Sequence, residues 1–213
     1  MPRVPYKIDG VRVTGATTII SRFKDSEALK IWSNNLGLKG INYFEELKRV
    51  QNIGTTFHDH VESYITKKEF TLSDDPEVQS CFRGFLKWWG EFKSSVEIIW
   101  TEKHFISRKY KYGGTPDLLV KKNGKYLLID FKSSGAIYID NLLQGSAYAH
   151  LIKENEKIEI DNFVLARFPK DNSEPEIKYY NKTDLKEGFS QFKDYLKLFE
   201  KDKKLKKRMR KKK

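Results

Sequence analysis

Two apolar stretches joined by a tight turn constrain the fold of this 213-residue chain more than any other feature. The dipeptide Asn123-Gly124 lies between residues 114–121 and residues 125–132, and Asn-Gly is typical of a two-residue β-hairpin turn. We therefore predict that the two stretches pair as antiparallel strands. Asp117 lies in the first stretch and Asp130 in the second, so the pairing would bring two carboxylates to one end of a sheet.

A lysine accompanies the second carboxylate. Side chains of a strand alternate between the two faces of a sheet, so Asp130 and Lys132 point the same way while Phe131 points to the opposite side. An aspartate that ends a strand and a lysine on an edge are often ordinary solvated charges. Asp130, however, directly follows the apolar run 126–129, where a carboxylate is unfavourable unless it is paired or bound to a metal. The combination favours a functional site.

The residue types suit the hydrolysis of a phosphodiester. Attack on this anion adds negative charge, so such a site needs divalent cations, which hard oxygen ligands hold. Asp117 and Asp130 can fill that role for Mg²⁺ or Mn²⁺, as one ion or two. Lys132 can orient the attacking water, lower its pKa or stabilise the developing charge.

Four short motifs occur in an order that resembles a known family. Pro116-Asp117 followed by Asp130-Phe131-Lys132 resembles the PD-(D/E)xK nuclease superfamily. Residues 54–62, Gly-Thr-Thr-Phe-His-Asp-His-Val-Glu, resemble the G-T-x-x-H-x-x-x-E motif of RecB-type exonucleases, and Gln144 to Tyr148 resembles their Q-x-x-x-Y motif. The resemblance covers about residues 50 to 170.

This resemblance implies an α/β fold, in which a mixed central sheet flanked by helices forms a restriction-endonuclease-like core with an N-terminal helical elaboration. It also implies the site, with metal ligands His58, Asp117, Asp130 and the Phe131 carbonyl, and catalytic groups Lys132, Asp117, Asp130 and Glu62. Gln144 and Tyr148 are implied as DNA-binding residues, near the DNA backbone or the catalytic lysine. Some RecB-type nucleases hold an iron–sulfur cluster with four cysteines. Cys81 is the only cysteine, so we expect no cluster here.

Several of these assignments have simpler alternatives. His58 and Glu62 share one face of a predicted helix, but without the motif His58 could be a surface or capping histidine. Tyr148 could equally serve core packing. Glu102 lies at the start of a predicted strand, where RecB-type relatives often carry an acid. It could act in the second shell of the metal or coordinate it directly, although a structural ion pair is slightly favoured. His60 faces elsewhere, so we assign it a structural role.

The remaining pattern predicts one compact unit with extensions. We expect an N-terminal hairpin at Asp9-Gly10 and a helical flap over 1–50, a nuclease core over 51–200 and a disordered basic tail over 201–213. Within the core we predict a helix around His58, a helix capped at Asp75-Pro76, strands at 97–107, 114–121, 125–132 and 159–168, and helices at 140–153, capped by Asp140 or Asn141, and at 183–201. The N-terminal hairpin would lead into a helix capped near Ser21 or Asp25.

Charge indicates the partner. The chain carries a formal net charge of +12, which suits a polyanion such as DNA, single- or double-stranded. Residues 201–213 contain ten basic residues and one acid, so the tail carries most of the non-specific attraction. The start of the chain lacks a signal-like apolar stretch, and no run is long enough to span a membrane. We therefore expect a non-secreted protein of the cytoplasm or a host-cell interior, of the kind encoded by phages or viruses.

The sequence thus predicts a Mg²⁺- or Mn²⁺-dependent deoxyribonuclease, more specifically an exonuclease of DNA recombination, repair or processing. Two alternatives stay open. One is a catalytically silent nucleic-acid-binding module on a nuclease scaffold, and the other is a restriction-type endonuclease.

Overall fold

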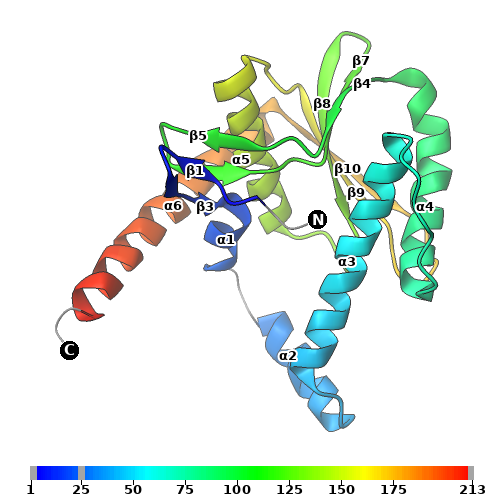
Figure 1. The fold of residues 1–213 in the computed structure, drawn as a ribbon, viewed down its shortest axis with the longest axis horizontal. Helices are drawn as coiled ribbons and strands as arrows, with labels where there is room; N and C mark the ends of the chain where they lie inside the picture. The colour runs from blue at the N-terminus through cyan, green and yellow to red at the C-terminus, as the bar shows by residue number, and fades with distance from the viewer. Residues whose placement is uncertain (1–3, 24–26, 211–213) are drawn as a thin grey trace.

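The computed structural model describes residues 4–23 and 27–210, which form a mixed α/β architecture around a five-stranded sheet (Figure 1). The strand order is β10-β9-β8-β7-β4, and only the β8–β9 pair is parallel. These strands are β4 (Glu97–Thr101), β7 (Leu118–Lys122), β8 (Lys125–Lys132), β9 (Asn162–Arg167) and β10 (Glu176–Asn181). The prediction of an α/β fold with a mixed central sheet flanked by helices is confirmed.

The predicted hairpin forms the centre of this sheet. Asn123 and Gly124 both have positive φ, +49° and +79°, as the tight turn between antiparallel strands requires. The register places Leu118 opposite Ile129 and Lys122 opposite Lys125. Asp117 immediately precedes β7. This register therefore places it next to the C-terminal end of β8.

Alternation along the strands divides the core into two layers. Leu118, Val120 and Ile129 pack on one face against helices α3 (Tyr43–Ile65) and α4 (Pro76–Phe92). Leu119 and Leu128 pack on the opposite face against α5 (Ile139–Glu156), α6 (Lys182–Arg210) and α1 (Ala16–Ser21). Asp130 and Lys132 share the parity of Leu128, so they face the α5 layer, whereas Phe131 packs in the α3–α4 layer, as predicted.

Local sequence explains where the long helices begin. The side chain of Asn42 accepts hydrogen bonds from the N–H groups of Phe44 and Glu45 at the start of α3. Asp75 caps α4 in the same way, with Pro76 at the first helical position, as predicted. The N-cap of α5 is Tyr138, so the prediction of Asp140 or Asn141 as the cap was wrong by two or three residues. Asn141 lies inside the helix, and its side chain accepts a hydrogen bond from the N–H of Tyr138.

Two predicted strands are each divided by a bend. Residues 97–107 form β4 and a separate strand β5 (Phe105–Ser107), while residues 112–122 form β6 (Tyr112–Gly114) and β7. The strands β5 and β6 leave the main sheet and join β3 (Thr14–Gly15) in a small second sheet. The prediction of one continuous strand over 97–107 and another over 114–121 was therefore wrong. The edge strand β10 was not predicted.

The N-terminal region combines a hairpin with projecting helices. Strands β1 (Lys7–Ile8) and β2 (Val11–Arg12) pair across Asp9-Gly10, as predicted. Ser21 ends α1 instead of capping a helix, and Asp25 lies outside the described residues. Helix α2 (Glu27–Leu38) and the first turns of α3 extend away from the sheet (Figure 1). The predicted boundary at residue 50 falls inside α3.

The C-terminal helix is longer than predicted. We expected it to end near Lys201 and to be followed by a disordered tail, but α6 continues to Arg210 and projects beyond the core (Figure 1). Lysine, arginine, leucine and methionine are good helix formers, and extending an existing helix adds one hydrogen bond for each residue fixed. Within the described residues, no helix combines the length and apolar character needed to cross a membrane.

Two helical glycines provide a matched test of this packing. A Cβ at Gly145 in α5 would lie 2.4 Å from the ring of Phe163, whereas a Cβ at Gly90 in α4 would meet nothing within 4 Å. We expect Gly145→Ala to lower the free energy of unfolding by about 1–3 kcal/mol through overpacking. Gly90→Ala should raise it by about 0.5–1 kcal/mol, because alanine favours the helix. Urea unfolding measures both, and equal effects of the two changes would contradict the α5–β9 packing.

Candidate functional site

Asp117 is held by backbone groups on both sides, at the bend between β6 and β7. Its carbonyl oxygen accepts a hydrogen bond from the N–H of Glu102 at 2.8 Å. Its Oδ2 accepts a hydrogen bond from the N–H of Phe131, also at 2.8 Å. The side chain is 11% exposed. These contacts fix the carboxylate beside the end of β8, where the hairpin register predicted it.

Helix α3 supplies an imidazole to the same place. Nδ1 of His58 lies 3.5 Å from Oδ2 of Asp117, and the His58 side chain is 29% exposed. Gly54, one turn earlier, lies near the loop that follows Lys132, since a Cβ there would meet Oγ of Ser133 at 3.4 Å, an ordinary van der Waals distance. The glycine and the histidine of the 54–62 motif therefore both lie on the side of α3 that faces this end of the sheet.

A third donor comes from the end of β4. Ligand atoms of His58, Glu102 and Asp117 all lie within 4.8 Å of one another. An octahedral ion with metal–oxygen bonds of about 2.1 Å has ligand atoms about 3 to 4 Å apart. Two carboxylates and an imidazole suit manganese or magnesium, so this donor set could hold a divalent ion once the three side chains move closer together.

Glu102 was predicted either to form a structural ion pair, the slightly favoured alternative, or to act as a second-shell or metal-coordinating group. Its carboxylate lies in the candidate ligand group with His58 and Asp117. In the structure it occupies the break between β4 and β5 with a left-handed φ of +43°, a conformation that a glutamate rarely adopts. Its carboxylate has an oxygen within 4.8 Å of ligand atoms of Asp117 and His58. No glycine, proline or asparagine marks the bend, so the sequence carries no signal for it.

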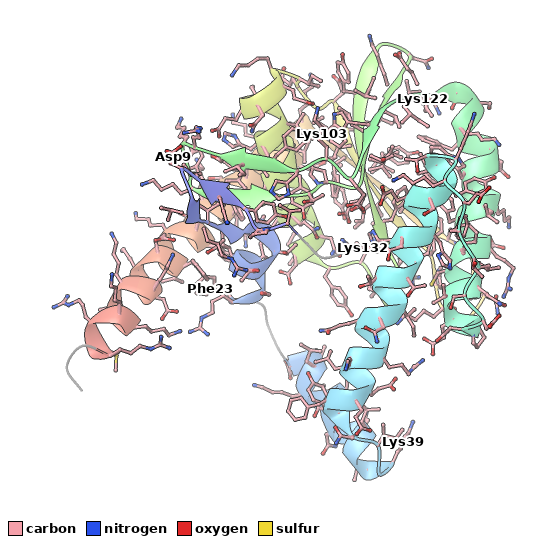
Figure 2. All side chains as sticks on the ribbon, in the orientation of Figure 1. Asp9, Phe23, Lys39, Lys103, Lys122 and Lys132 are labelled. Carbon is pink, nitrogen blue, oxygen red and sulfur yellow. The ribbon has the colours of Figure 1, made fainter. Side chains whose placement is uncertain are left out.

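Asp130 forms a second cluster beside the first. Its Oδ2 lies 2.5 Å from Nζ of Lys132, and its Oδ1 accepts a hydrogen bond from Nε2 of Gln144 at 3.2 Å. Oε1 of Gln144 accepts from Nζ of Lys132, also at 3.2 Å. Gln144 thus bridges both partners of the ion pair and orients the ammonium group. Figure 2 shows Lys132 beside α3, near the end of the central strands.

Burial perturbs the ionisation of Asp130. The residue is 1% exposed, and burial raises the pKa of its carboxyl to about 6. The charge of Lys132 acts in the opposite direction, and the nearby carboxylate of Asp117 raises the pKa further. The influence of Asp117 and His58 on this pKa shows that the two clusters share one electrostatic environment. A divalent cation at the first cluster would favour the ionised form of Asp130, which could then become a ligand.

The remaining predicted residues divide into two groups. Phe131 offers its N–H to Asp117, and because the N–H and C=O of one strand residue point to the same side, its carbonyl faces that side as well. Tyr148 is buried, and its hydroxyl accepts a hydrogen bond from Gln144, which favours the packing alternative over direct DNA contact. Glu62 forms an ion pair with Lys68 at 2.9 Å and is not part of the metal-ligand group.

His60 has the structural role that we assigned to it. It is 7% exposed, its Nε2 accepts a hydrogen bond from the N–H of Ser73, and its ring packs against Phe70 and Phe82. It therefore ties the segment before α4 to α3 and takes no part in the site.

The structure predicts which glutamate binds metal. We expect Glu102→Gln to weaken the binding of Mn²⁺ by about tenfold or more, because it removes one anionic ligand from a three-residue group. Glu62→Gln, the same change one turn beyond His58, should leave the affinity unchanged. Isothermal titration calorimetry measures both. A larger loss for the Glu62 variant would contradict this candidate ligand set.

The buried carboxyl also predicts a pH dependence of stability in the absence of metal. Asp130 ionises near its ordinary pKa of 3.8 when unfolded but near 6 when folded. At this site the folded state therefore binds more protons over this interval, and the contribution of Asp130 to stability falls by roughly 2–3 kcal/mol as the pH rises through it. This is opposite in sign to the contributions of Glu154 and Asp161, whose pKa values are lowered. In Asp130→Asn this decrease should disappear, whereas Asp194→Asn, at an exposed position of α6, should retain it. Urea unfolding in EDTA between pH 4 and 7 tests this, and parallel curves for the wild type and Asp130→Asn would refute it.

Comparison with known proteins adds little to this geometry. No family model matches the chain, and no curated protein matches it in sequence. Among solved structures, one titled “Putative exonuclease” from Eubacterium rectale is 12% identical, with a TM-score of 0.43 over 66% of this chain and 63% of the other. A second, titled SSO0001, is 16% identical with a TM-score of 0.34 over 69% and 72%. The chain thus spans less than two thirds of the first neighbour, and both scores are too low to carry an argument about function.

Proposed function

We propose that this protein is a divalent-metal-dependent nuclease that hydrolyses phosphodiester bonds of DNA. The observation that carries the proposal is the joining of two clusters at one end of the sheet: His58, Glu102 and Asp117 as ligands, and Asp130 with Lys132 next to them. Metal-ligating oxygens beside an oriented ammonium group provide the two things that attack on a phosphodiester needs. These are neutralisation of charge and a positioned nucleophile.

The residues divide the work according to their surroundings. Asp117, Glu102 and His58 would hold the ion, which supplies Lewis-acid polarisation of the phosphate and of a water molecule when it is bound. Lys132 would orient the attacking water and stabilise the negative charge that develops on the phosphoryl oxygens. Gln144 fixes the direction of Lys132 and keeps Asp130 in place. Gln144 is therefore a positioning residue in this proposal, and its side chain is not assigned to the DNA.

We further propose that the enzyme is an exonuclease, as the resemblance to RecB-type enzymes implies. The proposed role in recombination, repair or processing of DNA rests on the same resemblance. A silent nucleic-acid-binding module is the less favoured alternative, because it has no need to bury Asp130 next to Lys132 beside a ligand group.

Cleavage assays test both the chemistry and the mode of attack. With Mg²⁺ or Mn²⁺ the wild type should degrade linear DNA and leave a closed circle intact. Lys132→Ala and Asp117→Asn should each reduce the rate by a factor of about 10² to 10⁴, because each removes charge stabilisation or metal binding. Release of labelled nucleotides measures the rate.

Lys125→Ala provides the control, since Lys125 is an exposed lysine on the same strand at the far end of the hairpin. It should cleave at the wild-type rate. Undiminished cleavage by Lys132→Ala would refute the site, and discrete fragments from a closed circle would favour the endonuclease alternative. Metal-dependent DNA binding without any cleavage would favour the silent module.

A further inference from the structure

A groove lies between the end of α1 and the projecting part of α6, outside the site described above. It has a volume of about 560 Å³. Its lining comes from Arg22 of the α1 end and six residues of α6: Phe199, Asp202, Lys203, Lys206, Lys207 and Arg210. The segment that we expected to be a disordered basic tail thus forms one wall of a defined surface.

The lining is strongly cationic and internally ordered. Five of the seven side chains are basic and only Asp202 is acidic. Nε and Nη2 of Arg22 donate to Oδ2 of Asp202 at 3.2 and 3.0 Å, and Nζ of Lys206 donates to the same oxygen at 2.8 Å. Asp202 therefore ties α1 to α6 and holds two cations at fixed places. Charge of this sign and density fits an anionic ligand with several charges.

The groove also contains an aromatic surface. Phe199 is a half-buried residue of the groove lining. Phe23 follows Arg22, and its ring centroid lies 5.5 Å from that of Tyr195, which is one helical turn before Phe199. Phe23 lies at the end of α1 on the side of α6 (Figure 2). Cations that track phosphates, combined with aromatic rings on which bases stack, are typical of surfaces that bind single-stranded nucleic acid.

We propose that this groove binds a single strand of DNA outside the catalytic site, with the phosphates on Lys203, Lys206 and Arg210 and a base against Phe199. The assignment rests on the proposed nuclease function, which makes DNA the anionic ligand. A duplex would find phosphate contacts on a purely basic surface equally well. The half-buried aromatic ring favours the unpaired strand, whose bases are accessible for stacking.

The helical period provides a matched pair of variants. Lys203, Lys206 and Arg210 lie on the groove side of α6, whereas Lys201, Lys204 and Arg208 lie on the opposite side of the same helix. Each set contains two lysines and one arginine, so replacing either set by glutamine removes the same charge from the same segment. Glutamine is a good helix former, and circular dichroism verifies that α6 persists.

The test measures affinity by fluorescence anisotropy in EDTA, with labelled single-stranded and duplex oligonucleotides of equal length. The groove triple variant should bind the single strand about tenfold more weakly near 0.1 M salt, and the slope of log K against log salt should fall by about 2. The affinity of the opposite-face variant for the single strand should fall by less than about threefold. Its replaced charges lie a helix diameter of about 10 Å from the groove, and at 0.1 M salt interactions over this distance are largely screened. Phe199→Leu should weaken single-strand binding and leave the salt slope unchanged.

Two results would overturn the proposal. Equal losses from the two triple variants would mean that α6 acts only as diffuse charge. If the groove triple variant loses as much affinity for the duplex as for the single strand, the groove does not select an unpaired strand.

Hydrolysis of bis(p-nitrophenyl) phosphate with Mn²⁺ separates the groove from the catalytic site, because this small phosphodiester needs no groove. Turnover by the groove variants should equal that of the wild type. If neither the wild type nor any variant hydrolyses it, and the groove triple variant still binds DNA more weakly, the proposed nuclease function is wrong and the proposed DNA-binding groove is supported. If turnover is intact and the groove triple binds DNA as the wild type does, the groove fails and the nuclease stands.

Discussion

The two hydrogen bonds that hold Asp117 are the constraint on which the rest of the site depends. Its carbonyl oxygen binds the N–H of Glu102, and its carboxylate binds the N–H of Phe131. A side chain held in this way bridges the end of β4 and the end of β8 at the point where β7 begins. Because β7 and β8 are paired in one register, Asp117 cannot shift without moving Asp130 and Lys132 as well.

The site places a buried carboxylate, which is unfavourable when ionised, at the end of firmly packed strands. The strands that carry it are buried on both faces, which fixes the positions of their ends. Asp130 lies in this buried environment and has a raised pKa, and its ion pair with Lys132 is oriented by Gln144. Breaking such a pair leaves a buried charge without compensation, so these three side chains act as one unit. A cation at the neighbouring ligands would relieve the unfavourable ionisation of Asp130, which couples metal binding to the charge state of the site.

The central part of the site could be predicted because its signals are local. The Asn-Gly turn sets the hairpin register, and the period of two places Asp130 and Lys132 on one face with Phe131 on the other. The helical spacing of four residues did not give the same certainty, since His58 reaches Asp117 but Glu62 pairs with Lys68. Which of two neighbours on one helix face enters a site depends on the tilt of the helix, and spacing alone does not determine the tilt.

Other features depend on contacts that a single sequence does not reveal. Glu102 lies in the candidate ligand group at a break between strands where its backbone is left-handed, and no turn-forming sequence marks this break. The strand β10 lies at an edge of the sheet, and its six residues, Glu-Ile-Lys-Tyr-Tyr-Asn, contain a single aliphatic side chain, so they lack a strong apolar pattern. The basic C-terminal segment has a composition typical of disorder, yet it continues a helix that is already packed on α5 and is tied to α1 by Asp202. In each case tertiary structure overrides the local signal.

The central claim is that His58, Glu102 and Asp117 share one divalent cation at the end of the sheet. Diffraction from crystals of the protein grown with Mn²⁺, recorded at a wavelength where manganese scatters anomalously, tests it most directly. We predict an anomalous peak about 2.2 Å from a ligand atom of each of the three residues. A peak elsewhere on the protein, with these three side chains left uncoordinated, would contradict the account.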